Sequence, residues 1–244
     1  TAITPIIAEY DAQRDTEKGR TAFQNGLILC TILGFAIFFF LFMAKPLLAY
    51  MNQPTEVVKL ARPFLDIVGF SLVPLVVFQA YKQIAAGMSE TSYSMYATII
   101  GNIINIVLNI VLVFGLFGFP KLGIVGSAIG TLVARIFMVL YMHYILSKKE
   151  KFKPYFKAFG WQSFERKMTK KIIELGVPSS MQMFFEVALF TGAIWLSGMI
   201  GTTSQAANQI ALSLASLTFM FAMGLSVTAM VRVANQKGLD DYPK

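Results

Sequence analysis

Residues 177–196 read VPSSMQMFFEVALFTGAIWL, an apolar stretch with one carboxylate, Glu186, near its middle. About twenty apolar residues are enough for a helix to cross the hydrocarbon core of a bilayer. A carboxylate at that depth costs about 2.5–3.5 kcal/mol on insertion scales, and such residues usually face a cavity and bind an ion or a substrate. The alternative is a residue near a membrane surface that reaches water. Because Glu186 lies well inside the stretch, the sequence favours a functional carboxylate.

The composition of the whole chain indicates that lipid is its main solvent. Hydrophobic residues make up 56% of the 244 residues, charged residues only 14%, and the mean hydropathy is +0.62. A soluble domain carries about 25% charged residues. We therefore predict an all-α integral membrane protein with about six transmembrane helices. The expected spans lie near 22–44, 63–86, 94–118, 122–146, 174–199 and 204–230. Pro63 is expected to open the second span and Pro74 to kink it.

The basic residues are distributed unevenly between the two sides of such a bundle. One side, formed by residues 1–20, 82–93, 147–171 and 231–244, carries 16 Lys and Arg residues, and the other side carries four. The positive-inside rule places the basic side, with both ends of the chain, in the cytoplasm, in a multi-pass protein of the cell inner (cytoplasmic) membrane. This asymmetry explains the net charge of +8 without a nucleic-acid partner. Aromatic and basic residues alternate in 147–171, which predicts a segment lying on membrane lipids of the inner leaflet.

The sequence lacks the motifs of most enzyme classes. It has no Gly-rich loop of the Walker type, one histidine (His143, expected at the membrane interface) and one cysteine (Cys30). No cluster of His, Cys, Asp and Glu has the spacing of a metal enzyme. We therefore expect neither an enzyme nor a prosthetic cofactor, and transport here would be driven by an ion gradient.

A polar stripe runs along the third span. Asn102, Asn105 and Asn109 are three and four residues apart, so they share one helix face. Three amides in an apolar membrane helix are unfavourable unless they have partners. They act either as hydrogen-bonding contacts between helices or as a cation or substrate site, and both interpretations stay open. Further polar candidates for lining a cavity are Gln79 and Tyr81 in the second span and Gln182 in the fifth.

Several motifs together resemble the multidrug and toxic compound extrusion (MATE) family of transporters. Their order and spacing extend through nearly the whole chain. They are GIVGSAIGTLVAR at 123–135, LGVP at 175–178 followed by Phe185-Glu186, AANQIA at 206–211, and GLS at 224–226 leading to VRVANQ at 231–236.

The resemblance implies a fold of twelve helices in two six-helix bundles, of which this chain would be the central part. Residues 1–146 would belong to the N-terminal bundle as helices three to six, 147–171 would be the cytoplasmic linker between the bundles, and 172–244 would start the C-terminal bundle as helices seven and eight. The family works as a monomer.

The resemblance also assigns roles to the polar residues. Some branches of the family use a carboxylate at the position of Glu186 for cation coupling. The N-terminal bundle of the family places a cation site on helix five, which here would be Asn105 and Asn109, with Thr131 as the neighbour on helix six. Position 109 is often Asp in the family, so a carboxylate of the first helix would have to supply the charge that Asn109 lacks.

The resulting hypothesis is an antiporter coupled to Na⁺ or H⁺ that exports small organic cations and drugs, with Glu186 as the candidate Na⁺ ligand. One alternative is a flippase for lipid-linked oligosaccharides of the same superfamily, which needs a cationic cavity for pyrophosphate. Another is a membrane module that binds without transporting. The sequence leaves the coupling ion and the range of substrates open.

Overall fold

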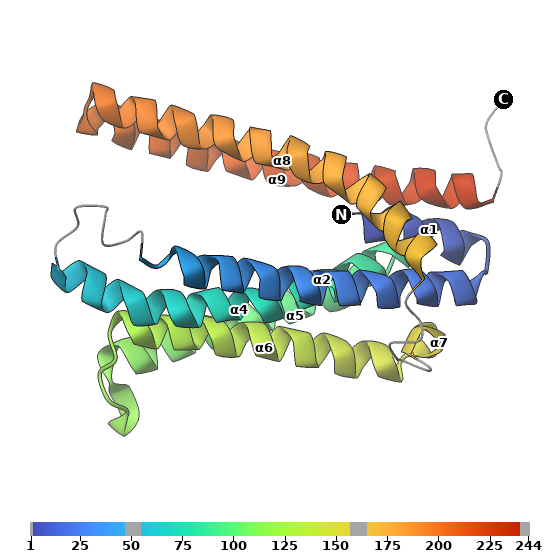
Figure 1. The fold of residues 1–244 in the computed structure, drawn as a ribbon, viewed down its shortest axis with the longest axis horizontal. Helices are drawn as coiled ribbons and strands as arrows, with labels where there is room; N and C mark the ends of the chain where they lie inside the picture. The colour runs from blue at the N-terminus through green and yellow to red at the C-terminus, as the bar shows by residue number, and fades with distance from the viewer. Residues whose placement is uncertain (1, 47–54, 157–164, 240–244) are drawn as a thin grey trace.

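The computed structural model describes residues 2–46, 55–156 and 165–239, and within these ranges it contains helices and no strands (Figure 1). Six of the helices are long and apolar enough to cross a membrane. This confirms the predicted all-α membrane fold. The elements are α1 (Ile3–Ala12), α2 (Thr16–Ala44), α4 (Thr55–Gly87), α5 (Thr91–Phe114), the 3₁₀ turn η1 (Leu116–Gly118), α6 (Ile124–Lys148), α7 (Lys153–Phe156), α8 (Arg166–Ile200) and α9 (Thr202–Gly238).

Local chemistry explains where several of these helices begin and end. Asp15 caps α2, because its carboxylate accepts a hydrogen bond from the backbone N–H of Lys18 at 3.0 Å. Gly115 ends α5 in the left-handed conformation, with φ of 72°, which glycine adopts without a steric penalty. The third span therefore stops at Phe114, earlier than the expected 118.

Two helices, α4 and α8, begin earlier in the sequence than the expected spans. Pro63 does not open the second span, since it lies inside α4, which begins at Thr55. α8 begins at Arg166, within the segment assigned to the linker, and not near 174. Both expected starts were placed where the apolar stretch begins, whereas the first turns of α4 and α8 contain charged residues. Such turns belong to the helix by their backbone hydrogen bonds, but hydropathy alone does not include them.

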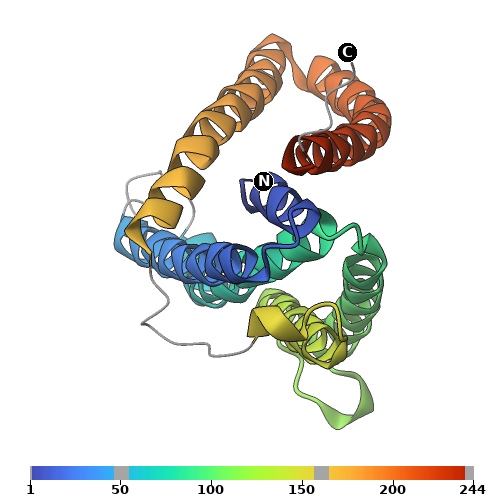
Figure 2. The same ribbon diagram turned by 90° about the vertical axis from the view of Figure 1, so that its right-hand side faces the viewer.

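The helices form a main bundle with a separate pair beside it. α2, α4, α5 and α6 pack side by side, and α8 and α9 form an antiparallel pair joined at Gly201 (Figures 1 and 2). The short α1 lies between the two groups and contacts α2, α4 and α9.

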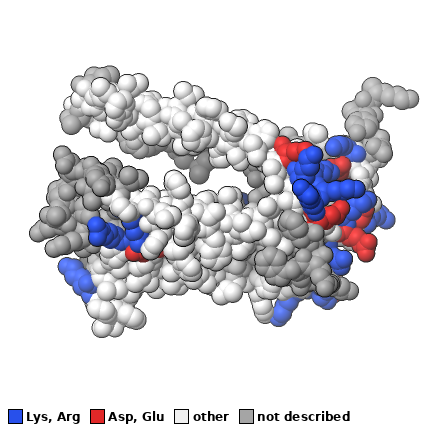
Figure 3. Space-filling model, in the orientation of Figure 1, with Lys and Arg blue, Asp and Glu red and all other residues white. Residues whose placement is uncertain are grey.

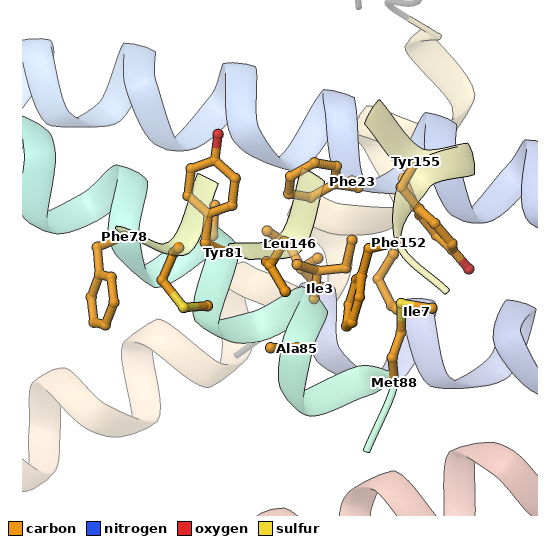
Figure 4. Packing of buried hydrophobic residues seen from close by; sticks show 14 of the residues in the cluster. Ile3, Ile7, Phe23, Phe78, Tyr81, Ala85, Met88, Leu146, Phe152 and Tyr155 are labelled. Carbon is orange, nitrogen blue, oxygen red and sulfur yellow. The ribbon is translucent and has the colours of Figure 1, made fainter. Parts of the chain in front are cut away.

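The largest buried cluster lies where α1, α2, α4, α6 and α7 meet (Figure 4). Phe152 and Tyr155 are each 1% exposed and pack into this cluster with Phe23 and Leu146. We had expected these two rings to lie in the lipid headgroup zone, and that expectation is wrong for them. The ring of Tyr155 fits into the core because Gly19 leaves room for it, since a Cβ at position 19 would lie 2.9 Å from Tyr155 Cε1. The rest of the predicted surface segment includes residues 157–164, which lie outside the described residues.

Most charged side chains of the visible face gather at one end of the molecule, a smaller group lies at the opposite end, and the middle is almost free of them (Figure 3). We call this the basic end. It is defined by Lys148, Lys149, Lys151, Lys153, Arg166, Lys167, Lys170 and Lys171. The uncharged zone matches the apolar slab that six membrane helices require.

Candidate functional site

A chain of hydrogen bonds joins the polar stripe of α5 to α6. Asn109 Nδ2 donates to Asn105 Oδ1 at 3.2 Å, and Asn105 Nδ2 donates to Thr131 Oγ1, also at 3.2 Å. Thr131 Oγ1 in turn donates to the carbonyl of Ser127 at 3.0 Å. The structure thus brings together three of the residues selected from the sequence. We call Asn105, Asn109 and Thr131 the amide network.

The amide network ends in an oxygen that has no partner. Asn109 Oδ1 is buried and receives no hydrogen bond within the described part of the chain. It lies against Gly130, where a Cβ would be only 2.6 Å away. A buried carbonyl oxygen without a donor is costly unless something else satisfies it. Amide and hydroxyl oxygens are ligands that hard cations accept, so this oxygen is a candidate cation ligand.

Glu186 lies on a separate helix pair and faces a pocket between α8 and α9. The pocket has a volume of about 500 Å³, and Glu186 is half-buried in its wall. Most of its lining is apolar, including Met183, Phe190 and Phe219. Within the described ranges, no Lys or Arg nitrogen lies within 4.0 Å of its carboxylate. The pocket therefore presents a negative charge to a space of small-molecule size.

Polar groups of α9 face Glu186 across this pocket. Gln209, Ser213 and Ser216 line it from the opposite wall. None of the three was predicted as a site residue from the sequence, although their spacing of four and three residues places them on one helix face. Both serine hydroxyls donate to backbone carbonyls of their own helix, at 2.8 and 2.7 Å, so their lone pairs remain available to a cation.

The other candidates are not part of either site. Asn102, Gln79 and Gln182 are exposed and have no hydrogen-bond partner in the described part of the protein. Tyr81 is buried, but in an aromatic cluster near the basic end, where its hydroxyl contacts His143 Nδ1 at 2.9 Å and its ring stacks on Phe156. The hydroxyl of Tyr81 thus joins α4 to α6, its ring helps to dock α7, and Tyr81 lines neither the Glu186 pocket nor the pocket between α2 and α8.

A second pocket, of about 710 Å³, lies between α2 and α8. Gly26, Cys30 and Leu33 line it from α2, and Met181 and Phe184 line it from α8. Its lining is mostly apolar and includes the ring of Phe184, which suits a hydrophobic compound. Sequence reasoning did not find this pocket because its two walls come from segments about 150 residues apart, and only the tertiary fold brings them together.

No group of three or more His, Cys, Asp and Glu side chains is placed to hold a metal ion among residues 2–46, 55–156 and 165–239. The two polar sites lie in apolar helices of a multi-pass membrane protein, where intramembrane polar residues are candidate ion or substrate sites.

The comparison with known proteins names its family. The family model described as MatE matches residues 1–111 and 178–243, which is more than half of the chain, so the chain belongs to the MATE family. The probable multidrug resistance protein NorM of Rhizobium meliloti is 32% identical over 98% of this chain, and the multidrug resistance protein NorM of Vibrio cholerae is 31% identical over 98% of it. The matches cover 51% and 52% of these relatives, so the chain spans about half the length of the curated relatives it matches.

Solved structures agree on the fold. A crystal structure of a MATE transporter in complex with MaL6 superposes with a TM-score of 0.82 at 25% identity, over 98% of this chain and 53% of that one. The eukaryotic MATE transporter AtDTX14 superposes with a TM-score of 0.80 at 19% identity, over 98% of this chain and 52% of that one. At the latter identity the likeness shows the fold alone.

Proposed function

We propose that the chain is part of an antiporter that exports organic cations and drugs in exchange for Na⁺ or H⁺. The observation that carries this proposal is the Glu186 carboxylate, which faces an apolar pocket of about 500 Å³ and has no basic partner in the described chain. A negative charge in such a place is unfavourable until a cation neutralises it. A coupling ion and an organic cation therefore compete for it, and that competition is the basis of exchange.

The amide network is the proposed second cation site. Its three side chains carry no charge, so they supply only dipoles to a bound ion. Asn109 Oδ1, which receives no hydrogen bond in the described part of the chain, suits the site to Na⁺ once an additional negative charge is present. The pocket between α2 and α8 is the proposed path of the drug, because Met181 and Phe184 give it a soft aromatic wall.

The arrangement in the membrane follows from the charges. We place the basic end in the cytoplasm of the cell inner membrane, where anionic lipids contact its lysines. Residues 1–146 form part of the first bundle, 147–171 connect the bundles, and 172–244 begin the second. The protein acts as a monomer without a prosthetic cofactor, and it is not an enzyme.

The flippase alternative lacks the charges that it needs. A pyrophosphate site requires several cations, and the one Lys or Arg deep within the six described spans is Arg135, which donates to Ser71 Oγ at 2.5 Å. A single guanidinium does not neutralise a pyrophosphate. The organic-cation antiporter is therefore the better-supported function.

The full-length transporter, expressed in a drug-sensitive bacterium, tests the proposal through ethidium efflux under separate Na⁺ and pH jumps. We expect Glu186→Gln to abolish the response to one of the two ions. The matched control is Glu150→Gln, since Glu150 is exposed and pairs only with Lys153. Efflux and ion dependence of Glu186→Gln equal to those of the wild type would show that the coupling role is wrong. Absent efflux in every variant, with binding of a lipid-linked pyrophosphate, would favour the flippase.

A further inference from the structure

The short helix α1 joins the two helix groups at the basic end. It packs against α2 and α4, and it also runs along the last turns of α9 (Figure 2). Ala8 of α1 forms a small buried cluster with Val231 and Ala234 of α9, apart from the main core. The two helices are in close contact at Gly238, where a Cβ would lie 2.5 Å from the backbone oxygen of Glu9. The contact thus depends on the absence of a side chain at position 238.

Glu9 stands at this contact and pairs with both helices of the second group. Its Oε2 lies 3.4 Å from Lys171 Nζ of α8, and its Oε1 lies 3.6 Å from Lys237 Nζ of α9. Lys171 also donates to the hydroxyl of Tyr10 at 3.3 Å and lies 4.9 Å from the centre of that ring. The side chain of Glu9 is only 17% exposed.

The two ion pairs of Glu9 link α1 to α8 and α9, unlike the ion pair of Lys170 beside them, which lies within one helix. Lys170, the neighbour of Lys171, pairs with Glu174 on its own helix at 3.6 Å, and both side chains are mostly exposed. Moving α8 and α9 away from α1 leaves that local pair unchanged. The same movement breaks both pairs of Glu9, whose lysine partners are 37% and 59% exposed, so each pair adds a modest bias toward the closed contact.

The α2–α8 pocket begins just beyond these pairs. On α8 its lining runs from Ile172 to Phe184, on the side away from the basic end, and Cys30 lines it from α2. The helix groups are therefore in contact at the basic end and leave a pocket of about 710 Å³ between them further along. This is the geometry of a transporter closed toward the basic end.

We propose that Glu9, its partners Lys171 and Lys237, and the close contact at Gly238 form a latch that keeps the cytoplasmic side closed. The inference rests on the proposed transport function and on the cytoplasmic placement of the basic end. The latch breaks when the transporter opens to the cytoplasm and forms again when it closes. It is a bistable contact, in which a small set of charges biases one of two packings.

Accessibility of Cys30 tests the latch without any substrate. The full-length transporter, with any cysteine other than Cys30 replaced by serine, is placed in right-side-out and inverted vesicles, and a membrane-impermeant maleimide is added. We expect Glu9→Gln and Lys171→Gln each to speed labelling in inverted vesicles about two- to fivefold, the range that the loss of one or two ion pairs allows. Gly238→Ala, whose new Cβ would clash with the backbone oxygen of Glu9, should also speed it. Labelling in right-side-out vesicles should fall.

The matched control is Lys170→Gln, which removes a lysine beside Lys171 but no contact between the helix groups. Gly238→Ala changes no charge, so agreement between it and Glu9→Gln excludes a general electrostatic effect. A thermal-stability scan confirms that each variant is folded. Unchanged labelling in Glu9→Gln and Gly238→Ala, or an equal increase in Lys170→Gln, overturns the latch. Because labelling needs no transport, a failed efflux assay with a positive labelling result rejects the transport function alone.

Discussion

Asn105 donates its side-chain N–H to Thr131 Oγ1 over 3.2 Å, and this hydrogen bond joins α5 to α6 within the apolar part of the bundle. Thr131 Oγ1 in turn donates a hydrogen bond to the backbone carbonyl of Ser127. The same two residues are thus a structural contact and the proposed cation site. A contact of this kind can be tested separately for stability and for ion coupling.

Thr131→Val removes the hydroxyl but keeps the shape of the side chain. We expect it to lower the free energy of unfolding by about 0.6–2 kcal/mol, the range for hydrogen bonds between membrane helices, and to weaken the ion dependence of efflux. The control is Thr98→Val, because Thr98 bonds only to the carbonyl of Ser94 on its own helix. A double-mutant cycle with Asn105→Ala measures the coupling, and fully additive effects on the melting temperature would contradict the contact.

Gly130→Ala places a methyl group against Asn109. The new Cβ would lie 2.6 Å from Asn109 Oδ1, so either the amide rotates or α6 moves away from α5. Overpacking of this kind costs about 1–3 kcal/mol. Gly69→Ala is the comparison, since its Cβ would meet Phe38 at 3.5 Å, an ordinary van der Waals distance. Thermal unfolding of the purified variants checks the prediction, and equal melting temperatures for the two variants would be inconsistent with it.

Phe219→Ala removes an aromatic wall of the Glu186 pocket. We expect the affinity for ethidium to fall about two- to thirtyfold, because a cation over an aromatic face gains about 0.5–2 kcal/mol. The ion dependence should remain, since Glu186 is unchanged. Phe221→Ala is the control, as that ring is 80% exposed and does not line the pocket. Binding titrations and efflux rates at several ethidium concentrations separate the two variants, and similar losses in both would place the drug elsewhere.

The burial of the Tyr155 hydroxyl predicts that the folded protein loses stability at high pH. Burial in the core, assisted by the negative charges of Asp11 and Asp15, raises the pKa of Tyr155 to about 12. In the unfolded chain the phenol ionises near pH 10. Above that pH the unfolded state therefore releases a proton that the folded state retains, and stability falls between about pH 10 and 12 by up to about 2–3 kcal/mol.

The variant that isolates this effect is Tyr155→Phe, which keeps the ring and removes the ionisable hydroxyl. We expect its melting temperature at pH 7–9 to be close to that of the wild type, and to decline less steeply above pH 10. The comparison of melting temperatures across this range is the measurement. Parallel curves for the two proteins would show that Tyr155 does not titrate in the folded core.

Features that depend on neighbours along the chain were predictable from the sequence. Apolar runs of about twenty residues determine a membrane helix because each helix satisfies its own backbone hydrogen bonds. The face shared by Asn105 and Asn109 follows from the helical period alone. The depth of Glu186 in its apolar run follows from counting residues, and its pocket agrees with that count. The motifs of the chain also pointed to the family that the comparison confirmed.

The tertiary structure decided which of these local features meet. Tyr81 and Phe152 looked like cavity or membrane-surface residues, and both are buried in the core. Glu9 gave no signal in its own segment, because its two lysine partners lie more than 160 positions away. Helical period and hydropathy describe one helix at a time, whereas a pocket or a latch depends on the approach of two. That approach is set by small residues such as Gly130 and Gly238, whose close contacts only the folded chain shows.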